Sequence, residues 1–129
     1  MHNKIVTYLA YSKRCVKRWP LYCELKILPL DILITIEYAK TMFKFEHGLL
    51  PAVFNNYFKK PSHSYSTRYA TSRDNFEVMQ VCTAKDKSML RYLGPKTWMN
   101  IPIKIKQSLS LKVFIKSYRT HLIGNYDPP

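Results

Sequence analysis

The chain has 129 residues, of which 47% are hydrophobic and 14% aromatic. This is enough apolar material for about one domain with a core, and it argues against disorder along the whole chain. Twenty-one Lys and Arg residues against eight Asp and Glu give a formal net charge of +13, which repels itself unless a polyanion lies nearby, so nucleic acid or an acidic membrane surface is the expected partner.

Two helices are predicted before residue 50. The first, near residues 4–12, is short and is followed by a basic stretch and a break at Pro20. The second, near residues 31–47, has Asp31 placed to cap its start and Gly48 placed for a left-handed cap at its end. Its apolar residues recur at helical spacing: Ile32, Ile36, Ala39 and Phe43.

A strand at residues 32–36 is the alternative to this helix. The helix is favoured because strands usually end after about 4–8 residues, whereas the periodic pattern continues well beyond that length. A further short helix is predicted near residues 51–58, beginning at Pro51 and carrying a cluster of aromatic residues. Residues 59–75 are polar, rich in serine and without apolar periodicity, which predicts a loop or linker.

The next segment predicts a small β-hairpin. Residues 76–82 and 88–93 are interpreted as two short strands joined by a polar turn. Gly94 and Pro95 would end the second strand. Trp98 follows, between two segments rich in turn-forming residues, and is expected to be buried in the core beneath the last helix.

The clearest element is an amphipathic helix near residues 108–123. Ser108 or Ser110 can cap its start, and Gly124 can cap its end. Its apolar stripe consists of Leu111, Phe114, Ile115, Tyr118 and Leu122. Its basic stripe consists of Lys112, Lys116 and Arg119. The basic stripe fits either a phosphate-contacting face or the solvated face of an ordinary surface helix that docks by its apolar stripe.

The expected fold is therefore mainly α with a small β-hairpin. Residues 1–58 form an N-terminal helical part, residues 59–75 a polar loop or linker, and residues 76–126 a part made of the hairpin and the basic helix. We expect these parts to form one composite domain.

Residues that could support catalysis or bind metal are dispersed along the chain. The aspartates lie far apart, so a two-metal centre has no visible ligands, and no phosphate-binding or nucleophile motif is present. Cys15, Cys23 and Cys82 have no close metal spacing and are expected to be free thiols. Pairing of Cys82 with His63 or His121 is compatible with the sequence but not specific. We expect no enzymatic activity in this chain, no cofactor and no metal.

Localisation is predicted from what the N-terminus lacks. The apolar stretch before residue 11 is too short for a signal peptide, and the longest apolar run, residues 32–36, is too short to span a membrane. An intracellular protein, nuclear or cytoplasmic and not secreted, is expected.

The last third of the chain is purely basic, with no acidic residue between Lys87 and Tyr126. Tyr65 and Arg68, upstream of it, could stack on unpaired bases or could only tie a loop to the body of the protein. The full set of candidate nucleic-acid contacts is Tyr65, Arg68, Arg91, Lys96, Lys104, Lys106, Lys112, Lys116 and Arg119.

Several short motifs occur in a fixed order from about Asn3 to Tyr126. In the second half they are HSYSTR at residues 63–68, SMLRYLGPKTW at 88–98, Ile-Pro at 101–102 and SLKVF at 110–114. In the first half they are PLY at 20–22, LKILPL at 25–30, AKTMFK at 39–44 and GLLP at 48–51. This order resembles the C-terminal tail of jockey-like non-LTR retrotransposon reverse transcriptases.

The resemblance implies a parent protein with an endonuclease and an RNA-directed DNA polymerase domain upstream, copying element RNA at a nicked genomic target. It implies that this chain is non-catalytic, because the Phe/Tyr-x-Asp-Asp motif of the family lies outside it. One position departs from the family pattern: Met99 stands directly after the Trp, where the family usually has Asn, and Asn100 follows. The departure argues against a specific role for the Asn side chain.

Two candidate functions, and a third alternative without function, follow from the residues and the resemblance. The favoured one is a basic region that binds template RNA or target DNA. The second is a structural or protein-interaction module that docks by its apolar stripe onto the upstream reverse transcriptase domain. The third is a non-functional remnant of a mobile element, to which the Met99 departure points.

Overall fold

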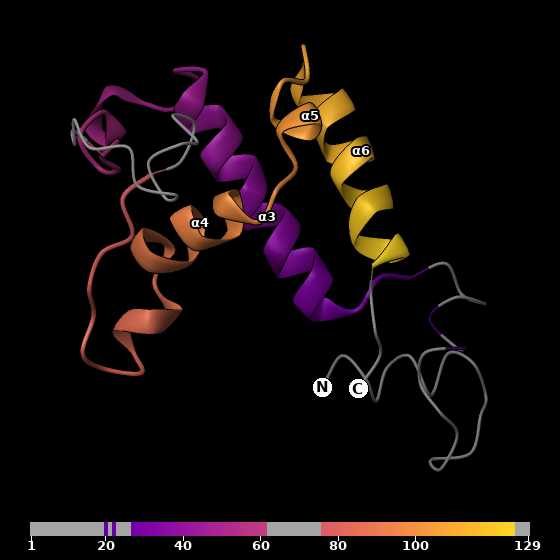
Figure 1. The fold of residues 1–129 in the computed structure, drawn as a ribbon, viewed down its shortest axis with the longest axis horizontal. Coiled ribbons are helices and arrows are strands. Elements are labelled where there is room, and N and C mark those ends of the chain that lie inside the picture. Colours follow the sequence, from indigo (N-terminus) through magenta and orange to yellow (C-terminus); the bar gives the residue numbers. More distant parts are fainter. Residues whose placement is uncertain (1–19, 21, 23–26, 62–75, 126–129) are drawn as a thin grey trace.

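The computed structural model describes residues 20, 22, 27–61 and 76–125. Within these ranges the structure is mainly helical, and α3 lies between α4 on one side and α6 on the other (Figure 1). The elements, in order, are α3 (Leu30–Glu46), η1 (Ala52–Phe54), η2 (Asp86–Ser88), α4 (Leu90–Met99), α5 (Ile103–Lys106) and α6 (Leu111–Gly124).

The structure confirms the long helix predicted near residues 31–47, as α3. Pro29, with extended backbone, is the N-cap, so the prediction that Asp31 caps the helix is wrong. Asp31 lies instead in the first turn, where its negative charge is attracted to the positive end of the helix dipole. Gly48 has a φ of 65°, which confirms the left-handed cap. The N–H groups of Gly48 and Leu49 donate to the carbonyls of Phe45 and Lys44 at 3.1 and 2.8 Å, as in a Schellman motif.

The other predictions for the first half are met in part or lie outside the described residues. The helix predicted near residues 51–58 is reduced to η1, a single 3-10 turn that begins after Pro51. The helix predicted near residues 4–12 and most of the 59–75 linker fall in segments that the structure does not describe.

The predicted β-hairpin is wrong. Residues 76–82 form no strand, and residues 90–93 begin α4, which continues through Gly94 and Pro95 to Met99. Pro95 has no N–H to donate to the carbonyl four residues earlier, which normally disfavours a helix. Here the Pro95 side chain is among the most deeply buried of the described part, and Gly94 is buried as well. Packing of this pair against the core outweighs its local preference for a turn.

The core lies where α3, α4 and α6 meet. Trp98 is 1% exposed, which confirms its predicted burial. Its ring centroid lies 6.0 Å from that of Phe114 and 6.3 Å from that of Phe76, and the Phe114 ring lies 4.6 Å from Phe43. Aromatic side chains from four segments therefore form one continuous contact chain, and burial of each contributes about 1.5–3 kcal/mol.

The structure confirms the C-terminal helix as α6, which runs beside α3 in the opposite direction (Figure 1). The backbone N–H of Val113 donates to the Ser110 hydroxyl oxygen, so Ser110 and not Ser108 is the cap. Gly124 is the last helical residue, and Asn125 is the C-cap in its place. Phe114 and Tyr118 are buried, and Leu111, Ile115 and Leu122 pack against the core beside them.

Candidate nucleic-acid interface

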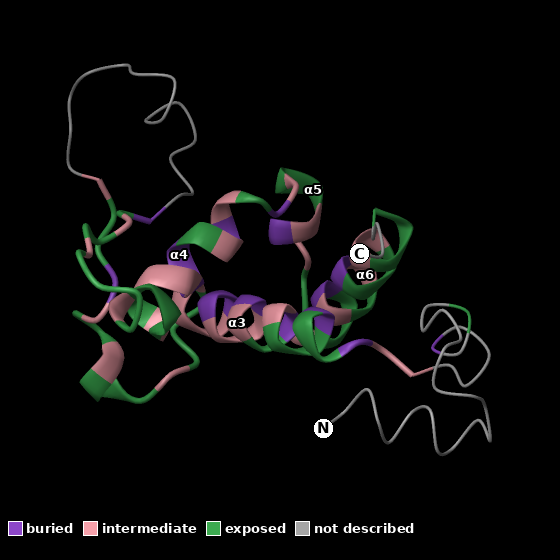
Figure 2. Ribbon diagram, turned by 90° about the horizontal axis from the view of Figure 1, so that it is seen from below, coloured by how far each residue is buried: buried purple, intermediate pink, exposed green. Residues whose placement is uncertain are grey.

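The basic stripe of α6 is exposed along its length. Lys112, Lys116 and Arg119 are four and three residues apart, a spacing that places them on one face of a helix. Phe114 and Tyr118 on the opposite face are buried against the core. Figure 2 shows buried positions on the side of α6 that faces α3 and exposed positions on the other side. We call these three residues the α6 basic face.

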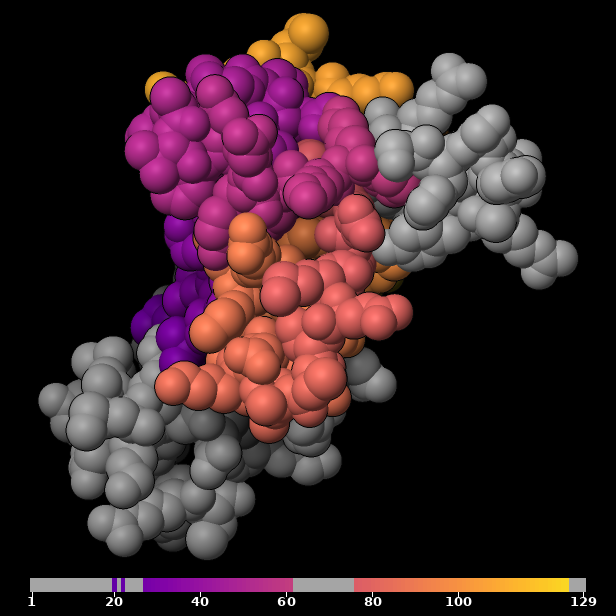
Figure 3. All heavy atoms as spheres, turned by 90° about the vertical axis from the view of Figure 1, so that its left-hand side faces the viewer, coloured from indigo at the N-terminus to yellow at the C-terminus, as the bar shows by residue number. Residues whose placement is uncertain are grey.

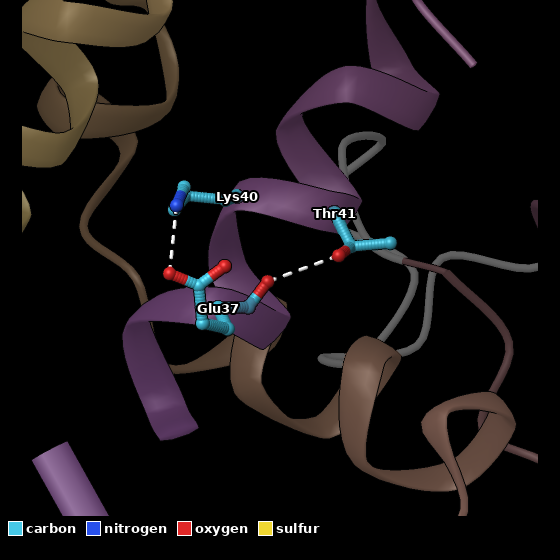
Figure 4. Close-up of polar contacts among 3 residues, drawn as sticks. All are labelled: Glu37, Lys40 and Thr41. Carbon is cyan, nitrogen blue, oxygen red and sulfur yellow. Dashed lines mark hydrogen bonds and ion pairs between the residues drawn. The ribbon is translucent and has the colours of Figure 1, made fainter. Parts of the chain in front are cut away.

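The ion pairs of the described residues lie elsewhere in the molecule. On α3, the Lys40 ammonium lies 2.7 Å from the Glu37 carboxylate (Figure 4). The Thr41 hydroxyl donates to the Glu37 backbone carbonyl at 3.0 Å in the same view. The second pair joins Lys60 and Glu46 at 2.6 Å. Within the described ranges no carboxylate pairs with the α6 basic face.

Two of the candidate residues, Arg91 and Lys96, lie on α4. The Arg91 guanidinium lies over the Tyr57 ring, with Cζ 4.9 Å from the ring centroid. The Lys96 ammonium lies 5.4 Å from the centroid of the Tyr92 ring. Both cationic side chains are exposed. The structure therefore places these two candidate contacts on a different helix from the α6 basic face.

The next two candidates both lie on the short helix α5 and differ in exposure. Lys104 is exposed, whereas Lys106 is 8% exposed with its ammonium 5.3 Å from the centroid of the Trp98 ring. Residues two apart on a helix point to different sides, and α5 presents the Lys106 side to the core. Lys106 was predicted as a nucleic-acid contact, but the structure places it in the core. Tyr65 and Arg68 lie outside the described residues.

The structure also brings Arg91 together with residues that are not among the predicted contacts. An open groove of about 300 Å³ lies where the segment after η1, the segment before η2 and the first turn of α4 meet. These segments lie side by side on the face drawn in Figure 3. Its lining residues are Tyr57, Phe58, Lys59, Glu77, Met79 and Arg91. A signal was present in the sequence, because an aromatic pair at 57–58 is followed directly by two lysines.

Other kinds of site find little support. Among the residues that the structure describes, no three His, Cys, Asp or Glu side chains are grouped as metal ligands would be. No helix in the same ranges has the length and apolar character needed to cross a membrane. In comparisons with known proteins, no protein-family model, curated protein or solved structure matches the chain.

Proposed function

We propose that this chain is a non-catalytic C-terminal region of a non-LTR retrotransposon reverse transcriptase, which binds template RNA or target DNA through the α6 basic face. The ordered motifs, from residues 20–22 to residues 110–114, support the family assignment by resemblance. The observation that carries the binding function is the exposure of Lys112, Lys116 and Arg119 on one face of a helix whose other face is buried.

The physical basis is counterion release. A cationic side chain that neutralises a phosphate displaces condensed counterions, so affinity falls as salt concentration rises. A rigid helix presents its charges at fixed spacing, and α6 is fixed by burial of Phe114 and Tyr118. The formal charge of +13 adds long-range attraction for a polyanion.

A matched pair of double variants tests the α6 basic face. Lys112→Gln with Lys116→Gln removes two charges from α6. Lys85→Gln with Lys87→Gln removes two exposed charges at η2, which lies on the other side of α3 (Figure 1). In titrations with labelled single-stranded RNA, the α6 variant should lower the salt slope by about 1.4, because each phosphate contact contributes about 0.7. The η2 variant should retain the slope. Equal effects of both variants would assign the binding to overall charge instead.

The alternative, an interaction module that docks by the apolar stripe of α6, is disfavoured by packing. Phe114 is fully buried within this chain, with its ring 4.6 Å from that of Phe43, and Tyr118 is 3% exposed. The Phe114 ring contacts Phe43 of α3 and Trp98 of α4, and both buried side chains are therefore not free for another protein. The remaining alternative, a non-functional remnant, predicts no salt-dependent binding in the same titration.

A further inference from the structure

The groove described above has walls from three segments that are distant in sequence. The turn that carries Tyr57 and Lys59 forms one wall, the extended stretch with Glu77 and Met79 forms the second, and α4 contributes Arg91. The backbone N–H of Glu77 donates to the Lys59 carbonyl at 2.8 Å, which joins the first two walls directly. The groove is thus built by the fold and not by one flexible loop.

A cation–π pair, Arg91 over Tyr57, lines this groove. The Arg91 guanidinium lies over the Tyr57 ring at 4.9 Å, and the Tyr57 ring makes edge contacts with Phe54 and Phe58 at 5.7 and 4.9 Å. These contacts hold the Tyr57 ring in place. Aromatic rings and guanidinium planes in open grooves are the surfaces on which unpaired bases stack. Met79, 48% exposed, adds a polarizable apolar contact beside them.

The charged residues of the groove determine which part of a nucleotide can bind there. Lys59 is exposed and suits a phosphate, but Glu77 carries a carboxylate that repels one. An ionised carboxylate only accepts hydrogen bonds, so Glu77 suits the N–H groups of a base edge. Guanine presents two adjacent N–H donors on its Watson–Crick edge. Each of the two oxygens of a carboxylate can accept one of these hydrogen bonds. Uracil presents one N–H between two carbonyls, which the carboxylate repels.

We infer that this groove holds one unpaired nucleotide of a bound strand, with its base against the Tyr57–Arg91 pair and its phosphate near Lys59, and that Glu77 makes guanine the preferred base. The inference rests on the proposed function, because it requires that the chain binds a single strand. In this arrangement the groove contacts a base of the strand, and the α6 basic face contacts its phosphates.

The test uses the full chain and two labelled RNA probes, a uridine oligonucleotide and the same oligonucleotide with one central guanosine. Fluorescence anisotropy should show several-fold tighter binding of the guanosine probe. Glu77→Gln should abolish that preference. Arg91→Lys keeps the charge but removes the planar guanidinium, and should raise the Kd for the guanosine probe about tenfold. Lys85→Arg is the control, because it also exchanges one cation for the other, at an exposed position outside the groove and the α6 basic face, and it should leave the Kd unchanged.

The possible failures are distinguishable, provided that far-ultraviolet circular dichroism shows each variant folded. Equal affinity of the wild-type chain for both probes, or equal Kd values for Arg91→Lys and Lys85→Arg, overturns the groove site while leaving salt-dependent binding by α6 intact. Absence of binding to either probe overturns the proposed function and the groove site together.

Discussion

A Cβ atom placed on Gly94 would lie 2.8 Å from the sulfur of Met42, so α4 meets α3 at a point where a glycine leaves room for a methionine. The same Cβ would lie 3.4 Å from Phe58 and 3.5 Å from Leu90. Met42 is fully buried, and because protein interiors are close-packed, moving its side chain aside is costly. This contact fixes how α4, and Arg91 with it, is placed on α3.

Gly94→Ala should therefore lower the free energy of unfolding. Overpacking of this kind costs about 1–3 kcal/mol, and the better helix propensity of alanine offsets about 1 kcal/mol of it. Urea denaturation measures the net change. Gly124→Ala is the control, because nothing lies within 4 Å of a Cβ at that position. If both variants were equally stable, the close approach of α4 to α3 would be disproved.

Phe114→Ala tests whether α6 belongs to the core of this chain. Removing this fully buried ring should cost about 3–5 kcal/mol, enough to unfold a domain of marginal stability. Val113→Ala on the same helix is 52% exposed and should cost far less. Thermal unfolding compares the two variants. A stable Phe114→Ala chain would instead favour the interaction-module alternative.

Lys106→Ala should reduce stability and leave nucleic-acid binding unchanged. Its ammonium lies over the buried Trp98 ring, and a desolvated cation–π contact contributes about 2 kcal/mol. Lys104→Ala removes an exposed charge from the same short helix and should change stability by no more than about 0.5 kcal/mol. If Lys106→Ala instead reduced the salt slope of nucleic-acid binding and left stability unchanged, Lys106 would be a nucleic-acid contact.

The stability of the fold should decrease at alkaline pH because of Tyr118. Burial raises the pKa of its phenol from 10.0 to about 12. A raised pKa favours the neutral form in the folded state, so this contribution is complete below about pH 10 and is lost as pH rises through about 12. A shift of this size corresponds to roughly 2–3 kcal/mol.

Tyr118→Phe should remove that part of the alkaline loss. The measurement is the free energy of unfolding of both chains across the alkaline range, with the other tyrosines and the lysines contributing equally to each. Parallel curves for the wild-type and variant chains would show that Tyr118 titrates alike in the folded and unfolded states.

The sequence predicted the elements whose signals are local. The apolar period of α3, the left-handed Gly48 and the Ser110 cap all depend on residues within a few positions. The hairpin was wrong because Gly94 and Pro95 signal a turn locally, while their burial between helices decides the outcome. That burial depends on residues about fifty positions away, such as Met42.

The same distinction applies to the candidate site. The α6 basic face could be predicted because its three residues lie on one helix. Burial of Lys106 depends on how α5 meets Trp98, which no local pattern encodes. The groove was missed because Tyr57, Glu77 and Arg91 are distant in sequence and meet only in the folded chain.

The salt dependence of binding by the wild-type chain tests the central claim most directly. Labelled single-stranded RNA and DNA are titrated at several salt concentrations. The logarithm of the observed affinity should fall linearly with the logarithm of salt concentration, with a slope of about −2 or steeper from three phosphate contacts by Lys112, Lys116 and Arg119. Absence of binding, or an affinity independent of salt, would contradict the assignment of this chain as a nucleic-acid-binding region.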